Sequence, residues 1–408
     1  MREKRPMFTK KFATSTKKIL FSFAVWRVAL FLVAFLAIYF IPKWGGWFPN
    51  EDRVLIPTKL PPWIWGFGNF DGIHYLKIMQ DGYKAIFSQA FFPLYPLLGR
   101  VLTLVNVFTP RNFQLDTNIF VDPAYFYNAF ILSNVLFIPA LYYLYKLFRL
   151  DYSEKTAFSA IILLLVFPTS FYFGAIYTES LFLLLVVLSL YLSRKKNYLL
   201  AGIFAALASA TRILGLSLFV VLFIEIISDI KARHLIVKSG QFVKSIFGLL
   251  IAPLGTAAYM VYLKIATGDW LYFLTAQPSF GAERSAKPFI LLPQVIYRYF
   301  KIFTSSSVPS LQYFTAVNEF FLTLIPLTLL LVFFKKIRLS YWLFAIICLV
   351  TPTLTGTLSS MPRYALMAFL LLPLVVEKTG KYYKYLVFLF LILGVILVSL
   401  FTRGYWVA

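Results

Sequence analysis

Long apolar runs constrain this chain more than any other feature of its sequence. The runs from Ile19 to Ile41 and from Tyr385 to Phe401 hold about 23 and 17 residues, with no acidic residue in either. As α-helices, runs of this length cross a hydrocarbon core about 30 Å thick. Only 13% of the residues are charged, against about a quarter in soluble domains. The sequence therefore predicts an all-α polytopic membrane protein.

The positive charge of the chain has two possible explanations. A formal net charge of +23 is compatible with nucleic acid binding. However, the Lys and Arg residues form short clusters between apolar runs rather than a basic stripe, which is typical of membrane topology signals. We therefore expect no nucleic acid partner. Cys348 is the single cysteine, which excludes an intramolecular disulfide and a cysteine-based metal site.

The basic clusters also predict the orientation of the chain. Residues 1–18 hold seven Lys and Arg and one acid, so we expect a cytoplasmic N-terminal tail followed by a retained first helix rather than a cleaved signal. Loops 43–123 and 266–301 have mixed charge and are expected to lie outside. On this basis Phe91 to Phe108 lies on, or dips partly into, the outer membrane face.

No linker or repeat divides the chain, so residues 1–408 are predicted to form one integral domain. It would contain about 11 transmembrane or half-membrane helices, at 19–42, 124–148, 156–175, 178–193, 198–211, 213–230, 244–265, 314–334, 340–358, 364–377 and 385–402.

In this topology, polar residues gather at the outer ends of the helices and in the first outer loop. A charged side chain inside a span costs about 2.5 to 3.5 kcal/mol on insertion scales, so such residues are functional candidates by default. Their common side of the membrane predicts a single site. The set comprises Asp71, His74, Glu179, Arg212, Arg363 and Tyr364.

Structural explanations compete with functional ones at these positions. Asp71 could simply cap a short interfacial helix, and Thr178 or Ser180 could cap the helix that begins near Glu179. A carboxylate followed three residues later by His74 also suits a general base and its orienting partner. The aromatic and proline residues of Phe91 to Pro96 are equally well explained by anchoring at the membrane interface.

Other common catalytic motifs are missing from the sequence. There is no Walker-type glycine loop, no nucleophile elbow, no H-E-x-x-H motif and no dinucleotide-binding fingerprint. The chain has two histidines, and His234 is predicted on the cytoplasmic side. A histidine-rich metal site is therefore excluded.

Five segments of the chain resemble the PIG-V family of mannosyltransferases, which are GT-C glycosyltransferases. They occur in the family's order and span about 300 residues, although Phe70 stands where the family is expected to have tryptophan. The segments are Phe70 to Tyr75, Phe91 to Pro96, Pro168 to Phe182, Gly202 to Gly215 and Pro362 to Tyr364.

This resemblance implies a GT-C-like bundle that transfers a hexose, mannose in this family, from a polyprenyl (dolichyl-type) phosphate sugar. The acceptor would be a hydroxyl on a glycolipid or glycan at the extracytoplasmic face, as in GPI-like glycolipid biosynthesis, and the reaction would invert the anomeric carbon.

The resemblance also assigns roles to residues. Asp71 would be the general base, and Arg212 and Arg363 would hold the donor phosphate. Substrate-binding or orienting roles would fall to His74, Tyr75, Glu179 and Tyr364. No metal or other cofactor is expected, because arginines can neutralise a lipid monophosphate; Asp71 and Glu179 leave a divalent ion possible but unsupported.

Two other classes stay open at this point. A lipid or oligosaccharide flippase would also be polytopic, but should carry polar residues at mid-membrane depth in both halves of a pathway. A noncatalytic subunit would need no polar cluster. The gathering of polar residues on one side favours the transferase.

Overall fold

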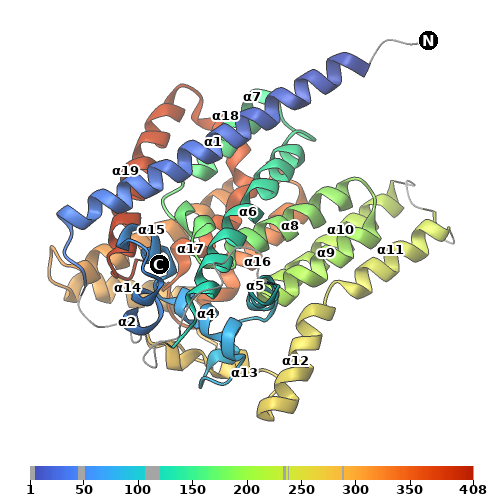
Figure 1. The fold of residues 1–408 in the computed structure, drawn as a ribbon. Coiled ribbons are helices and arrows are strands. Elements are labelled where there is room, and N and C mark those ends of the chain that lie inside the picture. Colours follow the sequence, from blue (N-terminus) through green and yellow to red (C-terminus); the bar gives the residue numbers. More distant parts are fainter. Residues whose placement is uncertain are drawn as a thin grey trace.

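The computed structural model describes residues 5–44, 51–105, 120–232, 236–237, 239–286 and 289–407. Within these ranges the regular secondary structure is helical, apart from one isolated bridge between Ile290 and Thr355. The helices pack into a bundle from which the beginning of α1 projects at one corner (Figure 1). The predicted all-α architecture is confirmed.

A first group of helices forms the body of the bundle, in which α8 packs between α6 and α9. They are α1 (Arg5–Phe40), α6 (Pro123–Phe148), α7 (Glu154–Leu165), α8 (Glu179–Arg194), α9 (Tyr198–Thr211), α10 (Ser217–Lys231), α11 (Gly240–Ile251), α12 (Leu254–Thr267), α15 (Leu311–Val332), α16 (Leu339–Thr353), α18 (Leu372–Thr379) and α19 (Tyr383–Thr402).

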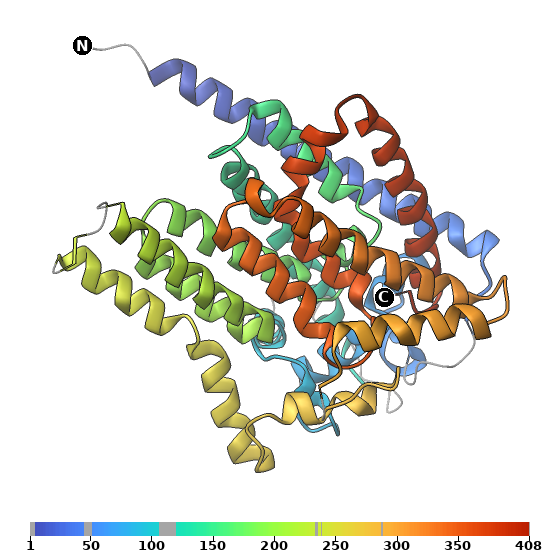
Figure 2. The ribbon, with the colours of Figure 1, turned by 180° about the vertical axis from the view of Figure 1, so that it is seen from behind.

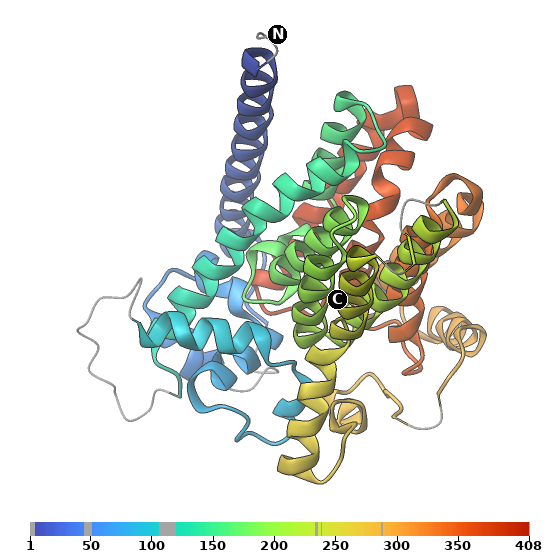
Figure 3. The same cartoon turned by 90° about the vertical axis from the view of Figure 1, so that its right-hand side faces the viewer.

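A second group of helices gathers toward the end of the bundle that lies away from the beginning of α1, in the lower part of Figure 3. They are α2 (Glu51–Val54), α3 (Pro62–Trp65), α4 (Asp71–Asp81), α5 (Leu94–Leu104), α13 (Tyr272–Thr275) and α14 (Leu292–Ser305). A further short helix, α17 (Met361–Tyr364), packs against α15 and α16. These elements come mainly from the two predicted outer loops.

Six helical segments in the described part of the chain are long and apolar enough to cross a membrane. They support an integral membrane protein, as the sequence predicts. The segments are Ser15–Phe40, Pro123–Phe148, Ile213–Lys231, Gly240–Thr267, Leu311–Val332 and Met361–Thr402.

Prolines interrupt two of the predicted spans. The span predicted at 156–175 stops being α-helical at Leu165, and after Pro168 the chain continues as a 3₁₀ turn, Ser170–Gly174. The span predicted at 244–265 is broken at Pro253, where α12 turns away from α11 (Figure 2). Proline has no N–H to donate and its ring clashes with the preceding turn. The prediction of a continuous α-helix over 156–175 is therefore wrong. The span predicted at 244–265 bends at Pro253 but lies within one helical segment, Gly240–Thr267, that is long enough to cross a membrane.

Helix α5 occupies the segment that the topology argument places at the outer face. It spans Leu94–Leu104, which corresponds to a length of about 16 Å. This is about half the thickness of a hydrocarbon core. The helix expected within Phe91 to Phe108 is therefore present in the described part of this segment, which ends at residue 105, and its position at the outer membrane face stays a prediction.

Small residues allow the backbones of α9 and α11 to approach closely. A Cβ atom at Gly202 would lie only 1.9 Å from the carbonyl oxygen of Gly248. After α9, a Cβ atom at Gly215 would lie 2.3 Å from the amide nitrogen of Ser209, so the chain can fold back tightly only because this residue is glycine. The fold-back places Arg212 at a turn, as predicted.

Arg27 is a charged residue inside the first span that the sequence interpretation overlooked. Its guanidinium carbon lies 4.2, 4.5 and 4.7 Å from the ring centres of Phe31, Phe67 and Phe130. The side chain is buried, and a Cβ atom on Gly174 would collide with it. Arg27 therefore stabilises helix packing through cation–π contacts.

Candidate active site

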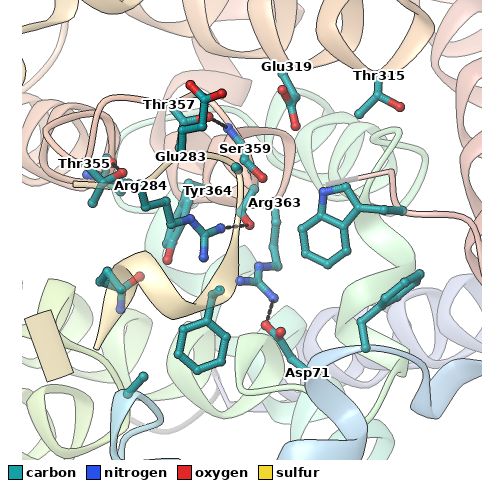
Figure 4. A pocket seen from close by; sticks show the side chains of 18 of the residues that line it. Asp71, Glu283, Arg284, Thr315, Glu319, Thr355, Thr357, Ser359, Arg363 and Tyr364 are labelled. Carbon is teal, nitrogen blue, oxygen red and sulfur yellow. Dashed lines mark hydrogen bonds and ion pairs between the residues drawn. The ribbon is translucent and has the colours of Figure 1, made fainter. Parts of the chain in front are cut away.

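A cavity of about 1050 Å³ lies where α4, α14, α15 and α17 meet. Its wall includes six of the seven residues that the sequence singles out, and the seventh, Glu179, lies directly behind them in contact with two arginines. The six are Asp71, His74, Tyr75, Arg212, Arg363 and Tyr364. Residues distant in the sequence therefore come together at one place, seen close up in Figure 4.

Asp71 is the first residue of α4, and its side chain does not cap that helix. The capping position is Phe70, whose φ of 59° is in the left-handed region. The Asp71 carboxylate instead accepts a hydrogen bond from Arg363 Nη1 at 2.6 Å. The capping explanation of Asp71 is therefore wrong, and the carboxylate faces the cavity (Figure 4).

The side chain of Phe70 supports this turn. Its ring centre lies 5.6 Å from that of Phe401 and 5.1 Å from that of Trp406. These contacts with the C-terminal part of the chain hold the beginning of α4 against α19. The strained φ of Phe70, a type of backbone feature that clusters at functional sites, directs the next residue into the cavity.

Four charged residues form a continuous ionic network at the base of the cavity. Asp71 pairs with Arg363 at 2.6 Å, Arg363 Nε lies 3.4 Å from Glu179 Oε1, and Glu179 pairs with Arg212 at 2.6 Å. The side chains are between 1% and 19% exposed. Two positive and two negative charges therefore balance in a largely buried environment.

This network changes the interpretation of the two arginines. The resemblance to the PIG-V family implies that both arginines hold the donor phosphate, a role that an unpaired buried guanidinium would suit. In the structure, Asp71 and Glu179 already supply carboxylates to both arginines. Glu179 is also not explained by helix capping, because Thr178 makes no side-chain cap bond and the Glu179 carboxylate contacts Arg212.

Tyrosine rings surround the arginines of the network. The guanidinium carbon of Arg363 lies 5.3 Å from the ring centre of Tyr177 and 5.7 Å from that of Tyr364, and Arg212 lies 4.9 Å from Tyr364. Tyr177 is itself fixed by a hydrogen bond from its hydroxyl to the carbonyl of Asn69. These cation–π contacts restrict the orientation of both guanidinium groups.

His74 lies one turn after Asp71 on α4. Its ring stacks on Phe91 at 5.0 Å and meets the edge of Phe280 at 5.9 Å. Tyr75, the neighbouring wall residue, packs against Phe91 at 5.1 Å. Phe91 to Pro96 therefore supports the wall of the cavity, in addition to any contact with the membrane.

The ionisation of the two α4 residues follows from their surroundings. Burial raises the pKa of Asp71, but the charge and hydrogen bond of Arg363 outweigh burial, so this pKa lies below its ordinary value. Burial lowers the pKa of His74 by more than the nearby Asp71 carboxylate raises it. At neutral pH Asp71 is therefore ionised and His74 is neutral.

The opposite wall of the cavity holds residues that the sequence interpretation missed. Glu319 on α15 is buried and accepts a hydrogen bond from the Tyr299 hydroxyl, which in turn accepts one from the amide of Leu358 at 3.2 Å. Glu319 lies inside an apolar run, so the rule that identified Glu179 could have found it. Arg284 also lines this cavity, but it lies in a loop of mixed charge where one more arginine gives no signal.

Among the residues that the structure describes, no group of three His, Cys, Asp or Glu side chains is arranged to hold a metal ion. Asp71 and Glu179 are the acids that the sequence leaves available for such an ion, and both contact arginines. The expectation that no metal is needed stays a prediction.

Comparison with protein families finds one match. A family model described as Mannosyltransferase (PIG-V) matches residues 17–398, which is nearly the whole chain. No sequence among proteins of curated function matches the chain.

Comparison with solved structures finds oligosaccharyltransferases from Archaeoglobus fulgidus. One, tethered with an acceptor peptide containing the NVT sequon, has 12% identity and a TM-score of 0.41 over 94% of this chain and 55% of its own. Another, AglB in complex with an inhibitory peptide and a dolichol-phosphate, has 11% identity and a TM-score of 0.42 over 94% and 56%. The chain spans about half the length of these proteins. With TM-scores of 0.41 and 0.42, the likeness supports no conclusion about the activity of the chain.

Proposed function

The chain belongs to the PIG-V family of mannosyltransferases, and we propose that it transfers mannose from a polyprenyl phosphate sugar to an acceptor hydroxyl on a glycolipid or glycan. The acceptor and the cavity would lie on the extracytoplasmic side. The observation that carries this proposal is the buried network of Asp71, Arg363, Glu179 and Arg212 beside a cavity large enough for a sugar phosphate.

Asp71 is the general base of the proposed reaction. The acceptor oxygen attacks the anomeric carbon and the hydroxyl proton moves to the Asp71 carboxylate. The bond from the anomeric carbon to the phosphate oxygen breaks, and its electron pair stays on the phosphate. Attack from the side opposite the leaving group inverts the anomeric carbon. A base that is ionised at working pH suits this step.

Arg363 couples proton transfer to the departure of the phosphate. The donor carries a phosphodiester monoanion, whereas the released polyprenyl phosphate carries a further negative charge. When Asp71 takes the proton it becomes neutral, so its attraction for Arg363 weakens at the same step. The guanidinium can then stabilise the leaving phosphate, with Arg212 next to it in the network, through charge-assisted hydrogen bonds.

The remaining residues contact the transferred sugar or orient Asp71 in this proposal. Glu179 Oε2 and Arg363 Nε form no hydrogen bond within the described residues, and buried polar atoms normally have partners. Both atoms are buried and Glu179 lies behind the cavity wall, so Glu179 would orient Arg212, Arg363 and, through Arg363, Asp71 rather than bind the sugar. His74, Tyr75 and Tyr364 line the same cavity.

A transfer assay tests the function directly. We expect purified protein to move radiolabelled mannose from polyprenyl phosphate mannose to a glycolipid acceptor, and not to use a nucleotide sugar alone. If a reconstituted protein instead moves lipid-linked sugar across vesicle membranes without forming a glycosidic bond, the chain is a flippase and the proposal is wrong.

The proposed orientation can be tested with single cysteines in a Cys348→Ser background. We expect Ser279→Cys and Asn112→Cys to react with an impermeant maleimide from outside intact cells, and Lys155→Cys to react only after permeabilisation. Ser279 and Lys155 are exposed, and Asn112 lies outside the described residues. Labelling of Asn112→Cys only after permeabilisation would show that Phe91 to Phe108 crosses the membrane and that the orientation is inverted.

The pH profile of the reaction distinguishes Asp71 from His74 as the base. Because the pKa of Asp71 lies below its ordinary value, which is about 3.9, the base stays ionised until strongly acidic pH. We therefore expect kcat/KM to stay level from about pH 7.5 down to about pH 5. A loss of activity with a midpoint near pH 6 that disappears in His74→Ala would assign the base to His74 instead.

A further inference from the structure

The ionic network leaves no positive charge in surplus for an incoming donor. Asp71 and Glu179 together neutralise Arg363 and Arg212. The donor's phosphodiester is a monoanion that must leave water to enter the cavity, and desolvating a charge without a counter-ion is costly. A cation outside the network is therefore needed before the reaction begins.

Two further arginines line the cavity within the described residues, Arg284 and Arg298. Arg298 already has partners, because it donates to Glu283 Oε2 at 2.6 Å and to the carbonyl of Gly356 at 3.1 Å. Arg284 donates to the neutral hydroxyl of Ser360 at 3.2 Å and forms no ion pair in the described part of the chain. Among the described residues, Arg284 is thus the lining arginine that forms no direct ion pair with a carboxylate.

From this difference, and resting on the proposed function, we propose that Arg284 binds the phosphate of the donor lipid before sugar transfer. Its guanidinium points into the cavity on the side of Arg363 in Figure 4, and its partner Ser360 lies three residues before Arg363 in the chain. The planar guanidinium can form two parallel hydrogen bonds to a phosphate. A phosphate there lies beside the arginine that receives the leaving group.

The backbone on both sides of Arg284 holds it in place. Gly281, Ala282 and Glu283 have successive φ values of 74°, 55° and 48°, and Ser360 has a φ of 68°. Non-glycine residues rarely adopt this region, and such conformations cluster at functional sites. The two segments meet through the hydrogen bond between Arg284 and Ser360, so the loop between α13 and α14 is tied to the beginning of α17.

The proposal separates the roles of two arginines. Arg284 contacts the phosphate in the bound donor and in the transition state alike, so its loss should raise the donor KM and leave kcat nearly unchanged. Arg363 gains its full interaction only as charge develops on the leaving group, so its loss should lower kcat. A purely structural role for Arg284 would not produce this division.

The decisive measurement is the affinity of the purified full chain, in nanodiscs of neutral lipid, for polyprenyl phosphate in the absence of acceptor. We expect Arg284→Ala to weaken this affinity by about 10- to 100-fold, and Arg284→Lys to weaken it less because the charge is kept. The matched control is Lys301→Ala, which removes one positive charge from the neighbouring helix α14 at an exposed residue outside the cavity wall and should stay within about threefold of wild type.

Three outcomes would overturn the assignment. Wild-type affinity in Arg284→Ala would show that other groups bind the phosphate. An equal loss in the matched control would show that the net positive charge of this face, rather than Arg284, determines the affinity. Displacement of polyprenyl phosphate by phosphatidylglycerol at equal concentration would identify a general anionic-lipid site. If wild-type protein transfers no mannose and binds no polyprenyl phosphate, the proposed function itself fails, which is a separate result.

Discussion

Asp71→Asn should reduce turnover by about 100-fold or more, the usual range for loss of a general base, while the purified protein still binds polyprenyl phosphate. Asparagine keeps the size of the side chain and can still accept a hydrogen bond from Arg363, but it cannot take a proton. Turnover is measured as mannose transferred per minute at saturating donor and acceptor.

The same variant should bind the released polyprenyl phosphate more tightly than wild type does. Asparagine at this position resembles protonated Asp71, so Arg363 loses the charge partner that it contacts at 2.6 Å in the structure and becomes available to a phosphate. A base that acted without coupling to Arg363 would leave product affinity unchanged. Comparing turnover with product affinity therefore tests the coupling as well as the base.

Asp81→Asn is the matched control for this experiment. Asp81 is the last residue of α4 and Asp71 the first, so both substitutions remove one acid from the same helix. Asp81 lies outside the cavity wall, and Asp81→Asn should keep turnover within about threefold of wild type. Near-normal turnover in Asp71→Asn would move the base elsewhere, with Glu179 the next candidate.

Most residues of this site could be predicted from the sequence, because a charged residue in an apolar segment is costly and therefore rare. Glu179 and Arg212 lie within or beside apolar runs, where a charged residue is costly, and their common side of the membrane predicts their meeting. The identity of the pairs could not be predicted. Asp71 and Arg363 are 292 positions apart, and only the tertiary fold brings the beginning of α4 next to Arg363 of α17.

The sequence interpretation missed Arg284 and the helix breaks at two prolines, for different physical reasons. Arg284 lies in a loop of mixed charge, and its importance depends on having Ser360 rather than a carboxylate as partner, which no local pattern reveals. The breaks at Pro168 and Pro253 occur at prolines visible in the sequence. Apolar composition continues through both, however, and hydropathy alone does not distinguish a kinked span from a straight one.

Arg363→Ala should be the most damaging of the arginine substitutions. Its guanidinium contacts both acids of the network, at 2.6 Å from Asp71 and 3.4 Å from Glu179. Its removal takes the arginine partner from Asp71 and leaves Glu179 paired with Arg212. Loss of a group that stabilises developing charge typically lowers kcat by about 100- to 1000-fold, and we expect kcat to fall by about 100-fold or more.

The substitution should also destabilise the folded chain, which provides a second readout. Removing one partner of a buried ion pair costs about 3 to 5 kcal/mol, so the temperature of half-unfolding in detergent should fall. Arg363→Lys should restore much of this stability because the charge returns. It should restore turnover only in part, because lysine lacks the planar fork of arginine.

The double variant Asp71→Asn with Arg363→Lys decides whether the two residues act as a unit. If the proton on Asp71 releases Arg363 to the phosphate, each single change already breaks the coupling, and the double variant should be little slower than the slower single variant. Arg403→Ala, which removes an arginine bonded to the carbonyl of Ile41 instead of to the network, is the control and should retain turnover. If the fold losses in turnover of the two single variants multiply in the double variant, Asp71 and Arg363 contribute independently. The proposal that Arg363 moves from the Asp71 carboxylate to the phosphate would then be wrong.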